Sequence, residues 1–536
     1  MKALPKDGFA GLKENGLNDL TSGFLVFLIA LPLCLGISMA SGFPPIAGIF
    51  TAIIGGLVVS PIMGSRVSIK GPAAGLIAIA VAAVADLGQG DAYTGYRLAL
   101  AVVVATGIIQ VLFAAFKFGR FVDFFPTSAV HGMLAAIGII IILKQFPVML
   151  GVKPSAKSPL GLLLELPSIL RHANPEISAI GLLSLTVLIA FPFLKHPFLK
   201  KLPAQMVVLL LAMALGAYFD LEHVHHYLFL HDDFVIGPDF LVTLPNNMLD
   251  GVTLPDFSQV FSATSLKYIL MFSLVGSLES LLTVKAVDGL DPYKRKSDTN
   301  RDLFAVGLGN TLAGLVGGLP MIAEVVRSGA NVNNGAKTRW SNFFHGAFLL
   351  AFVALVPGIL HLIPLSGLAA MLVFTGYRLA SPALFKATAK VGRDQLAIFL
   401  ITIAVTLGED LLVGIAAGIV LQLILHLASG AKLSSLFKPQ VEIKEADGSV
   451  KVILRSTAAF TNILGLQKAL KTVPNGKKVD IDLSEIHLID HSFMELLHDY
   501  EHAYQRSGGQ VQVTGHEALT SKSEHPLATK RRPKNA

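Results

Sequence analysis

The chain has 536 residues, of which 53% are hydrophobic and only 15% are charged, and its mean hydropathy is +0.64. Soluble domains carry about 25% charged residues, so this composition excludes a soluble globular protein and also a charge-rich disordered chain. The single cysteine, Cys34, excludes an internal disulfide and a thiolate metal cluster. The net charge of +7 does not indicate nucleic acid, because Lys and Arg lie in short loops between apolar runs.

Apolar runs that suit a bilayer-spanning helix of about 20 residues recur along the chain. We predict an α-helical polytopic membrane protein with fourteen spans, of which 72–88 and 327–340 are short. The runs occupy residues 22–40, 45–63, 72–88, 96–117, 127–150, 177–194, 204–219, 264–285, 302–317, 327–340, 341–360, 364–378, 394–409 and 412–429.

The loops between these runs differ in charge. Lys and Arg mark the cytoplasmic side of membrane proteins, and a cytoplasmic N-terminus places nearly all clustered basic residues inside. Asp86 and the Asp-, Glu- and His-rich segment 220–250 fall outside, and Lys153 and Lys157 are the exceptions. We therefore predict that both termini are cytoplasmic. The inner-loop residues are Lys117, Arg120, Lys195, Lys200, Lys201, Lys294, Arg295, Lys296, Arg301, Lys337, Arg339, Arg378, Lys386, Lys390 and Arg393.

The composition becomes charged after about residue 433. We assign 1–20 to a cytoplasmic N-terminus, 21–433 to a transmembrane domain, 437–515 to a small soluble domain and 516–536 to a basic disordered tail that includes Lys534. Strand and helix patterns alternate in the soluble domain, which indicates an α/β unit. The predicted strands are 450–454, 479–483 and 510–513, and the predicted helices are 461–472 and 490–506.

The two halves of the membrane region repeat each other, over about 21–219 and 264–430. Because each half has seven spans, an odd number, the second half is inverted, as in many secondary transporters. The matched positions are 54–57 with 316–319, then Pro126, Ser128, Met133 and Leu134 with Pro364, Ser366, Met371 and Leu372, and Lys70-Gly71 with Arg327-Ser328.

Each short run follows a stretch that is unlike a helix. Pro72 suits the first position of a helix, and Arg327 stands at the mouth of the second short run. Two facing helix N-termini attract an anion, and an arginine adds full charge and paired donors. We therefore predict an anion site that includes Arg327, with Lys70 as an accessory charge. The alternatives are a loop lysine at Lys70 and an inner-loop arginine at Arg327.

Glu279 lies in the middle of the eighth span, with apolar residues on both sides. An intramembrane carboxylate is costly and indicates function. Thr283 lies one turn away on the same face, so the two side chains could share a coupling cation. The alternative is a structural ion pair, for example with Arg327. The outer residues His223, His225, His226, His231, Asp232 and Asp233 match no metal-site spacing, and an ordinary polar loop is the better interpretation.

The sequence resembles the sulfate permease (SulP) family of anion transporters over nearly its whole length. The C-terminal unit resembles a STAS domain, the small regulatory domain found in this family. The residues that carry the resemblance are 19–23 with Leu31-Pro32, 43–48, 68–75, 276–283, 300–303 and 335–339 in the membrane region, and 480–484 with 489–492 in the C-terminal unit.

The resemblance implies a seven-plus-seven inverted repeat, divided into a core and a gate domain that move in an elevator-like cycle. It also implies a homodimer in the cell (inner) membrane and an anion held between the third and tenth helices. The implied anion contacts are Ala73, Ala74, Gly75, Val326, Arg327 and Ser328. Among family members the chain looks most like bacterial bicarbonate transporters, in which a carboxylate and the threonine matching Thr283 hold sodium.

Two departures from those transporters bear on mechanism. They have aspartate where this chain has Glu279, and proton-coupled members have glutamate, so Na⁺ and H⁺ both remain candidate coupling ions and no other cofactor is expected. They also have small residues where this chain has Glu324-Val325-Val326-Arg327. In the C-terminal motif, His491 and Phe493 replace the usual phosphoacceptor and glycine, although Ser492 remains.

Secondary transport of a small inorganic anion is therefore the predicted function, with bicarbonate ahead of sulfate, chloride or a dicarboxylate such as fumarate. A nucleobase–cation symporter shares the fold but would need neither Arg327 nor a STAS domain. A non-transporting membrane sensor that signals through its STAS domain would need neither Arg327 nor Glu279. Nothing in the sequence indicates an enzyme.

Overall fold

The structure is a computed structural model. Several residues singled out above lie outside the part of the chain that it describes: Arg120, Lys157, Lys195, Lys200, Lys201, His231 and Lys534. The chain divides into two compact units, Met1–Gly119 with Ile137–Arg378, and Arg120–Ala136 with Leu379–Ala536. The described residues are 4–119, 125–156, 158–193, 202–230, 232–245, 247–438, 440–446, 449–473, 477–506 and 508–533.

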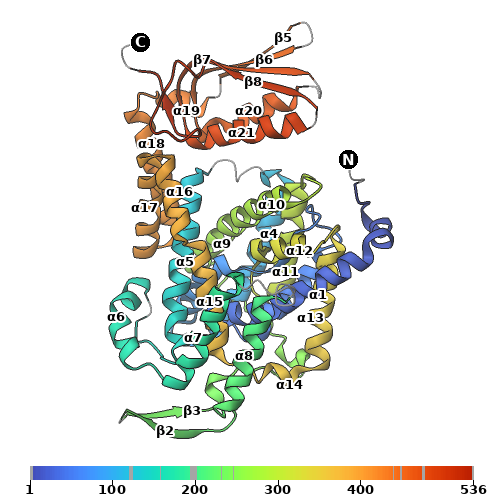
Figure 1. The fold of residues 1–536 in the computed structure, drawn as a ribbon, viewed down its shortest axis with the longest axis vertical. Coiled ribbons are helices and arrows are strands. Elements are labelled where there is room, and N and C mark those ends of the chain that lie inside the picture. The colour runs from blue at the N-terminus through green and yellow to red at the C-terminus, as the bar shows by residue number, and fades with distance from the viewer. Residues whose placement is uncertain are drawn as a thin grey trace. The chain divides into compact units, whose positions relative to one another are not determined.

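The first unit is almost entirely helical (Figure 1). Every predicted span in it contains a helix. Four helical segments that lie wholly in this unit are long and apolar enough to cross a membrane, and so are two segments that lie mostly in it. The helices are α1 (Gly8–Ala40), α2 (Pro45–Ile54), α3 (Ile77–Gly88), α4 (Ala92–Ala115), α5 (Thr127–Met149), α6 (Pro159–Arg171), α7 (Pro175–Ala190), α8 (Ala204–Tyr218), α9 (Ala263–Met271), α10 (Ser277–Leu290), α11 (Thr299–Val316), α12 (Val325–Asn333), α13 (Trp340–Leu355), α14 (Pro357–Leu360) and α15 (Leu365–Leu379).

Three elements differ from the predicted spans. Helix α12 ends at Asn333, well short of residue 340, because Gly335 adopts a φ of +89° that stops the helix. Helix α6 was not predicted; Ser158 caps it and Pro159 occupies its first turn, but its 13 residues are too few to cross a bilayer. The segment 220–250, which was predicted to lie outside, contains a hairpin of β2 (His225–Phe229) and β3 (Asp232–Ile236).

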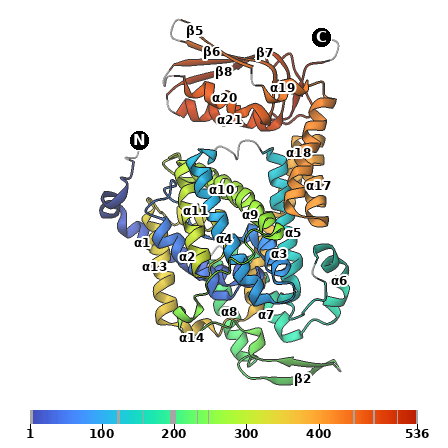
Figure 2. The same cartoon turned by 180° about the vertical axis from the view of Figure 1, so that it is seen from behind.

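Small residues bring the helices of this unit together. Helix α4 lies alongside α11 (Figure 2). Where α2 continues as a π-helical turn over Gly55–Val59, it crosses α13 closely. A Cβ atom at Gly56 would lie 2.5 Å from the Cα atom of Gly346, so neither position accepts a side chain. Such glycine contacts stabilise helix pairs in a bilayer, where burial of apolar side chains gives little drive for association.

The second unit combines helices with a six-stranded sheet. The helices are α16 (Pro382–Val391), α17 (Arg393–Gly408) and α18 (Leu411–Ala428), followed by the short α19 (Leu433–Phe437). The sheet contains β5 (Gln440–Ala446), β6 (Ser449–Ala458), β7 (Lys478–Ile489), β8 (Gln510–Thr514), β9 (Thr520–Ser521) and β10 (Lys530–Arg531), with helices α20 (Ile463–Lys471) and α21 (His491–Arg506).

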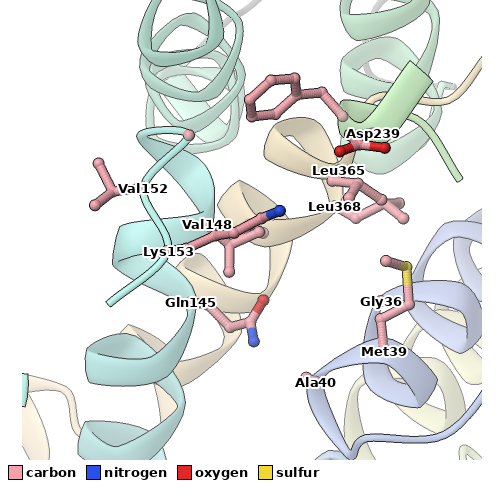
Figure 3. A pocket seen from close by; sticks show the side chains of 13 residues that line it. Gly36, Met39, Ala40, Gln145, Val148, Val152, Lys153, Asp239, Leu365 and Leu368 are labelled. Carbon is pink, nitrogen blue, oxygen red and sulfur yellow. The ribbon is translucent and has the colours of Figure 1, made fainter. Parts of the chain in front are cut away.

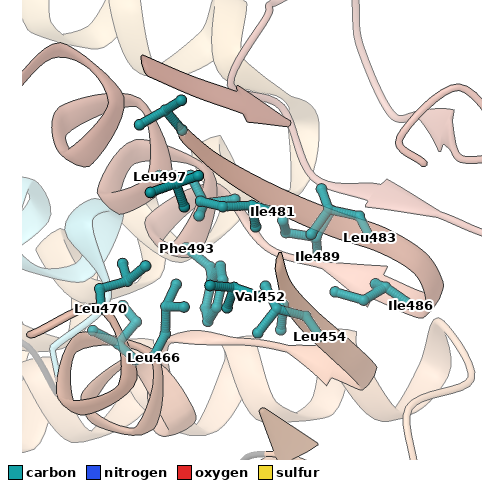
Figure 4. Close-up of a cluster of buried hydrophobic side chains, with 14 of the residues drawn as sticks. Val452, Leu454, Leu466, Leu470, Ile481, Leu483, Ile486, Ile489, Phe493 and Leu497 are labelled. Carbon is teal, nitrogen blue, oxygen red and sulfur yellow. The ribbon is translucent and has the colours of Figure 1, made fainter. Parts of the chain in front are cut away.

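The predicted β–α–β–α–β order of the soluble domain is present as β6, α20, β7, α21 and β8. Strands β6, β7 and β8 run parallel, while β5 adds an antiparallel edge that the sequence analysis missed. Alternate residues of these strands meet the apolar faces of both helices (Figure 4). Val452, Ile481 and Phe493 lie at this contact and are buried. One hydrophobic core therefore holds the sheet and helices together.

The prediction that residues 516–536 are disordered is wrong for the described part of this tail. Strand β10 pairs antiparallel with the second half of β7, with Lys530 opposite Ile489, and β9 pairs with β10. The first half of β7 pairs with β8, so its second half offers free backbone groups to the tail. Backbone pairing does not depend on apolar side chains, which is why the basic composition gave no signal.

Candidate functional site

The site predicted from the sequence is built around two three-residue strands. β1 (Lys70–Pro72) and β4 (Met321–Ala323) pair antiparallel, with Lys70 opposite Ala323 and Pro72 opposite Met321. A short 3-10 turn (Ala74–Leu76) leads from β1 into α3, and α12 begins just after β4. The two segments therefore leave the strand pair in opposite directions, and the N-termini of the two helical segments that follow lie close together. Their free N–H groups carry partial positive charge.

This crossing corrects one part of the repeat alignment. Lys70 is the first residue of β1, and the first residue of β4 is Met321. The residue that precedes the helical turn is Ala73 in one half and Glu324 in the other, with φ and ψ of −89° and 116° against −100° and 117°. Lys70 thus corresponds in position to Met321 and not to Arg327, which lies in the first turn of α12.

The predicted anion contacts flank this strand pair. Ala73, Ala74 and Gly75 are buried, as is Ser328, while Val326 is partly exposed. The Ser328 hydroxyl accepts a hydrogen bond from the Ile69 N–H at 2.8 Å, so it joins the two halves of the site. The six residues predicted to contact the anion therefore gather at one place.

Arg327 has no solvent exposure. One terminal nitrogen donates to the Pro72 carbonyl at 3.2 Å, and the other lies 3.5 Å from the sulfur of Cys34. A Cβ atom at Gly71 would collide with the guanidinium, so the glycine makes room for it. Arg327 Nε has no hydrogen-bond partner among the described residues, and the salt bridges of those residues do not include Arg327. Its buried charge is thus available to an anion.

Glu279 approaches the same crossing from α10. A Cβ atom at Gly75 would overlap both of its carboxylate oxygens, so only glycine allows this approach. Glu279 Oε2 is buried without a hydrogen-bond partner in the described part of the chain. Thr283 lies one turn further along α10 and is 3% exposed. The alternative of a Glu279–Arg327 ion pair is absent from the described salt bridges.

Glu324 is a site residue that the sequence analysis did not assign. It occupies the position before α12 but makes no capping bond to its own helix. Instead its Oε1 accepts a hydrogen bond from the Ala74 N–H, at 3.3 Å, on the other side of the crossing. The one signal in the sequence was its departure from the small residues that bicarbonate transporters of the family have there.

Lys70 does not act as the predicted accessory charge. Its Nζ lies 2.5 Å from Asp302 Oδ2 of α11, and neither side chain has any solvent exposure. The alternative of a solvated loop lysine is wrong as well, because the side chain is fully buried. Since Asp302 neutralises this ammonium group, Lys70 stabilises the fold around β1.

Side chains of neighbouring helices position β4. The Ser280 hydroxyl of α10 accepts from the Ala323 N–H at 3.1 Å, and Asn310 Oδ1 of α11 accepts from the Met321 N–H at 2.5 Å. Gln110 of α4 in turn accepts from the Asn310 amide at 2.7 Å. These bonds satisfy buried backbone groups of a non-helical segment, which a bilayer interior requires.

Two other regions contain none of the predicted site residues. The histidines of segment 220–250 form separate pairs, such as His226 with Asp233 at 3.1 Å, and no group of three metal-binding side chains occurs within the described ranges. A cavity of about 230 Å³ lies between the ends of α1 and α5 and the start of α15 (Figure 3). Its lining is mostly apolar, with Gln145, Lys153 and Asp239 as polar residues.

Comparisons with known proteins agree with this architecture. The sulfate permease family model matches residues 17–402. The putative sulfate transporter YvdB of Bacillus subtilis is 24% identical over 93% of this chain and 91% of its own. The bicarbonate transporter BicA of a Picosynechococcus strain is 24% identical over 82% of this chain and 75% of its own.

Solved structures show the same fold. The transmembrane domain of a cyanobacterial BicA matches 77% of this chain and 99% of its own with a TM-score of 0.63 and 24% identity. The mouse anion transporter Slc26a9, in its inward-facing state, matches 93% of this chain and 85% of its own with a TM-score of 0.66 and 14% identity. The predicted helical membrane fold with an added α/β unit is confirmed. From the matched family model and the shared fold, the chain belongs to the sulfate permease family.

Proposed function

We propose that this member of a family of anion transporters carries out secondary active uptake of a small inorganic anion, with bicarbonate as the first candidate. The proposal rests on the environment of Arg327. Its side chain is fully buried beside two helix N-termini and forms no salt bridge with a carboxylate among the described residues. A buried unpaired charge is strongly unfavourable. An anion that binds there supplies the missing charge.

Bicarbonate and sulfate are both consistent with this geometry. Each is an oxyanion that accepts hydrogen bonds from a guanidinium and from backbone N–H groups. The names of the relatives support both anions, since BicA is a bicarbonate transporter and YvdB a putative sulfate transporter. Chloride and dicarboxylates such as fumarate remain alternatives. A sensor that signals through its C-terminal domain is the alternative of another class, and Arg327 and Glu279 favour transport over it.

Glu279 and Thr283 are our candidates for the coupling site. Their carboxylate and hydroxyl oxygens suit either a Na⁺ ion or an exchanged proton, and Glu279 approaches the anion site at Gly75. An ionised Glu279 repels the anion, and a bound cation removes that repulsion. Cation and anion then favour each other's binding, which is the condition for symport.

The remaining proposals follow the family resemblance. The transport cycle is elevator-like, the protein is a homodimer in the cell (inner) membrane, and both termini are cytoplasmic. The α/β unit from β5 to β10 is its STAS domain. The described Ser492 hydroxyl accepts from the Thr127 N–H at 3.1 Å and is 6% exposed, so a kinase does not reach it in this arrangement.

Uptake by proteoliposomes tests the function. Labelled bicarbonate, sulfate, chloride and fumarate are supplied separately, with and without a Na⁺ gradient and a pH gradient. We expect saturable uptake of one inorganic anion that one of the two gradients accelerates. Saturable uptake of fumarate alone would favour the dicarboxylate alternative, and no uptake of any anion would favour the sensor.

A further inference from the structure

The Glu324 carboxylate, which belongs to the second repeat, lies at the helix N-terminus of the first repeat, where the anion is proposed to bind. Glu324 directs its side chain away from α12 and accepts a hydrogen bond from the Ala74 N–H, at 3.3 Å. Its counterpart in the first repeat, Ala73, has nearly the same backbone conformation but no side chain that could reach across. The contact is therefore one-sided: one repeat supplies the N–H group and the other supplies a tethered oxyanion.

We propose that the Glu324 carboxylate takes the place of the transported anion when none is bound, and that anion and carboxylate compete for this place. A carboxylate and a bicarbonate ion present the same pair of oxygen acceptors to an N–H donor. The inference rests on the proposed anion-binding function, and it adds a residue that regulates when the site accepts its substrate.

A second observation also indicates a ligand here. Arg327 is fully buried in the first turn of α12, three residues after Glu324, and its Nε has no partner within the described residues. Glu324 lies near enough for the two charges to interact, but their described atoms form no ion pair within 4 Å. The Glu324 carboxylate thus accepts a hydrogen bond from the Ala74 N–H but leaves Arg327 Nε as a donor for a bound anion.

Glu324 is able to leave this position. Its contact with Ala74 is a single hydrogen bond, and it has no bond to its own helix. Glu324 as a residue is only partly buried, and the following residue, Val325, is 49% exposed. Rotation of the Glu324 side chain therefore breaks one hydrogen bond.

The charges around Glu324 make the competition sensitive to protons. Glu279 of α10, Arg327 of α12 and the Cys34 thiol of α1 face the site, and the buried His345 of α13 lies near Arg327. The nearby Lys70 is neutralised by Asp302. If both glutamates were ionised beside a bound anion, three negative charges would face the single positive charge of Arg327. Uptake of a proton by Glu324 as it leaves lowers this repulsion. Removal of the charge by mutation should have the same effect at neutral pH.

The test compares Glu324→Gln and Glu324→Ala with the unchanged protein in proteoliposomes. Labelled sulfate and chloride are the probes, because each keeps its charge between about pH 6 and 8. For the probe that the unchanged protein takes up, we expect both variants to lower the half-saturating concentration by about ten- to a hundredfold at pH 8. This is the range for loss of one competing charge-assisted hydrogen bond. The difference should shrink at pH 6. Glu409→Gln, a change at an exposed residue between α17 and α18, is the matched control.

Thermal unfolding in detergent provides a measurement that does not depend on transport. A bound anion stabilises the folded protein, and the part of this stabilisation that Arg327→Ala lacks reports on the anion site. In the Glu324 variants, the same stabilisation should require proportionally less sulfate or chloride. Equal or weaker stabilisation of both variants at a given anion concentration would overturn the competition. If the unchanged protein shows neither uptake nor stabilisation with either probe while bicarbonate is transported, stabilisation by bicarbonate at constant pH replaces the measurement.

The outcomes separate this inference from the proposed function. If the unchanged protein transports an anion but neither variant binds it more tightly, the competition alone is wrong. If no tested anion is transported and none stabilises the unchanged protein more than Arg327→Ala, both the proposed function and the competition are wrong.

Discussion

The Lys70 ammonium and the Asp302 carboxylate lie 2.5 Å apart, and both side chains are entirely buried. The second carboxylate oxygen of Asp302 accepts from the Ser65 N–H at 3.1 Å, so the pair ties β1 and the segment before it to α11. The pair fixes one of the two strands whose crossing brings the helix N-termini together. The ion pair therefore stabilises the position of β1, which forms part of the anion site.

Loss of one partner should destabilise the protein more than loss of both. Lys70→Met or Asp302→Asn leaves a buried charge uncompensated, at a cost of roughly 3–5 kcal/mol. The double variant Lys70→Met/Asp302→Asn should recover most of this loss. Thermal unfolding in detergent measures the effect, with Lys153→Met as an exposed control. A double variant as unstable as the sum of the single ones would show that the two charges act independently.

Replacement of Arg327 should abolish saturable uptake. The helix N-termini alone supply only partial charges, so Arg327→Ala should weaken anion binding by about a hundredfold or more, as for a lost charged hydrogen-bond donor. The protein should still elute as a folded species in detergent. Arg171→Ala removes an exposed arginine at the end of α6 and should leave uptake unchanged. An unchanged half-saturating concentration in Arg327→Ala would contradict the assignment.

The C-terminal unit should lose stability as the pH rises, because of Asp490. Burial raises the pKa of this carboxyl, although nearby His426 and the N–H groups of Phe460 and Phe493 act in the opposite direction. Between the unfolded and the folded pKa, the folded state binds more protons, so the free energy of unfolding falls as pH increases through that window. Above the folded pKa the stability no longer changes with this group.

Differential scanning calorimetry of the full chain between about pH 4 and 8 tests this prediction. Asp490→Asn should remove the decline for the transition of the C-terminal unit. Asp482→Asn is the matched control: a bond from Lys451 and two from Ser484 lower the Asp482 pKa to about 2, so its own effect falls below that pH range. The same decline in Asp490→Asn would assign the pH dependence to another group.

The sequence predicted charged residues at the site better than it predicted their partners. Glu279 stood out because it interrupts an apolar run, where an ionisable group is costly, and Arg327 because it stands at the mouth of a short run. The partner of Lys70 lies 232 positions away, and no local pattern indicates which of many distant acids it meets. Glu324 precedes a helix, where an acidic side chain ordinarily interacts with the N-terminus of its own helix, so its reach to Ala74 follows only from the strand pairing. The strand β10 was missed because its two residues are too few to show alternation.

Glu279→Gln should separate anion binding from coupling. The glutamine amide has the size of the carboxylate beside Gly75, but it is uncharged and does not bind or release a proton. The variant should still exchange labelled anion across the membrane, because Arg327 and the helix N-termini are unchanged. Its uptake should no longer respond to an imposed Na⁺ or pH gradient, since position 279 no longer has a negative charge that binds a cation. Glu409→Gln, in an exposed loop, should retain the full response.

Thr283→Val then distinguishes the two coupling ions. A Na⁺ ion needs several oxygen ligands, so loss of this buried hydroxyl should raise the half-saturating Na⁺ concentration if Na⁺ is the coupling ion. A proton needs only the Glu279 carboxylate, and a proton-driven transporter should tolerate Thr283→Val with little change. Comparison of the two gradients in the same proteoliposomes therefore identifies the ion. Full gradient-driven accumulation by Glu279→Gln would assign coupling to another residue and leave Glu279 as a structural neighbour of Gly75.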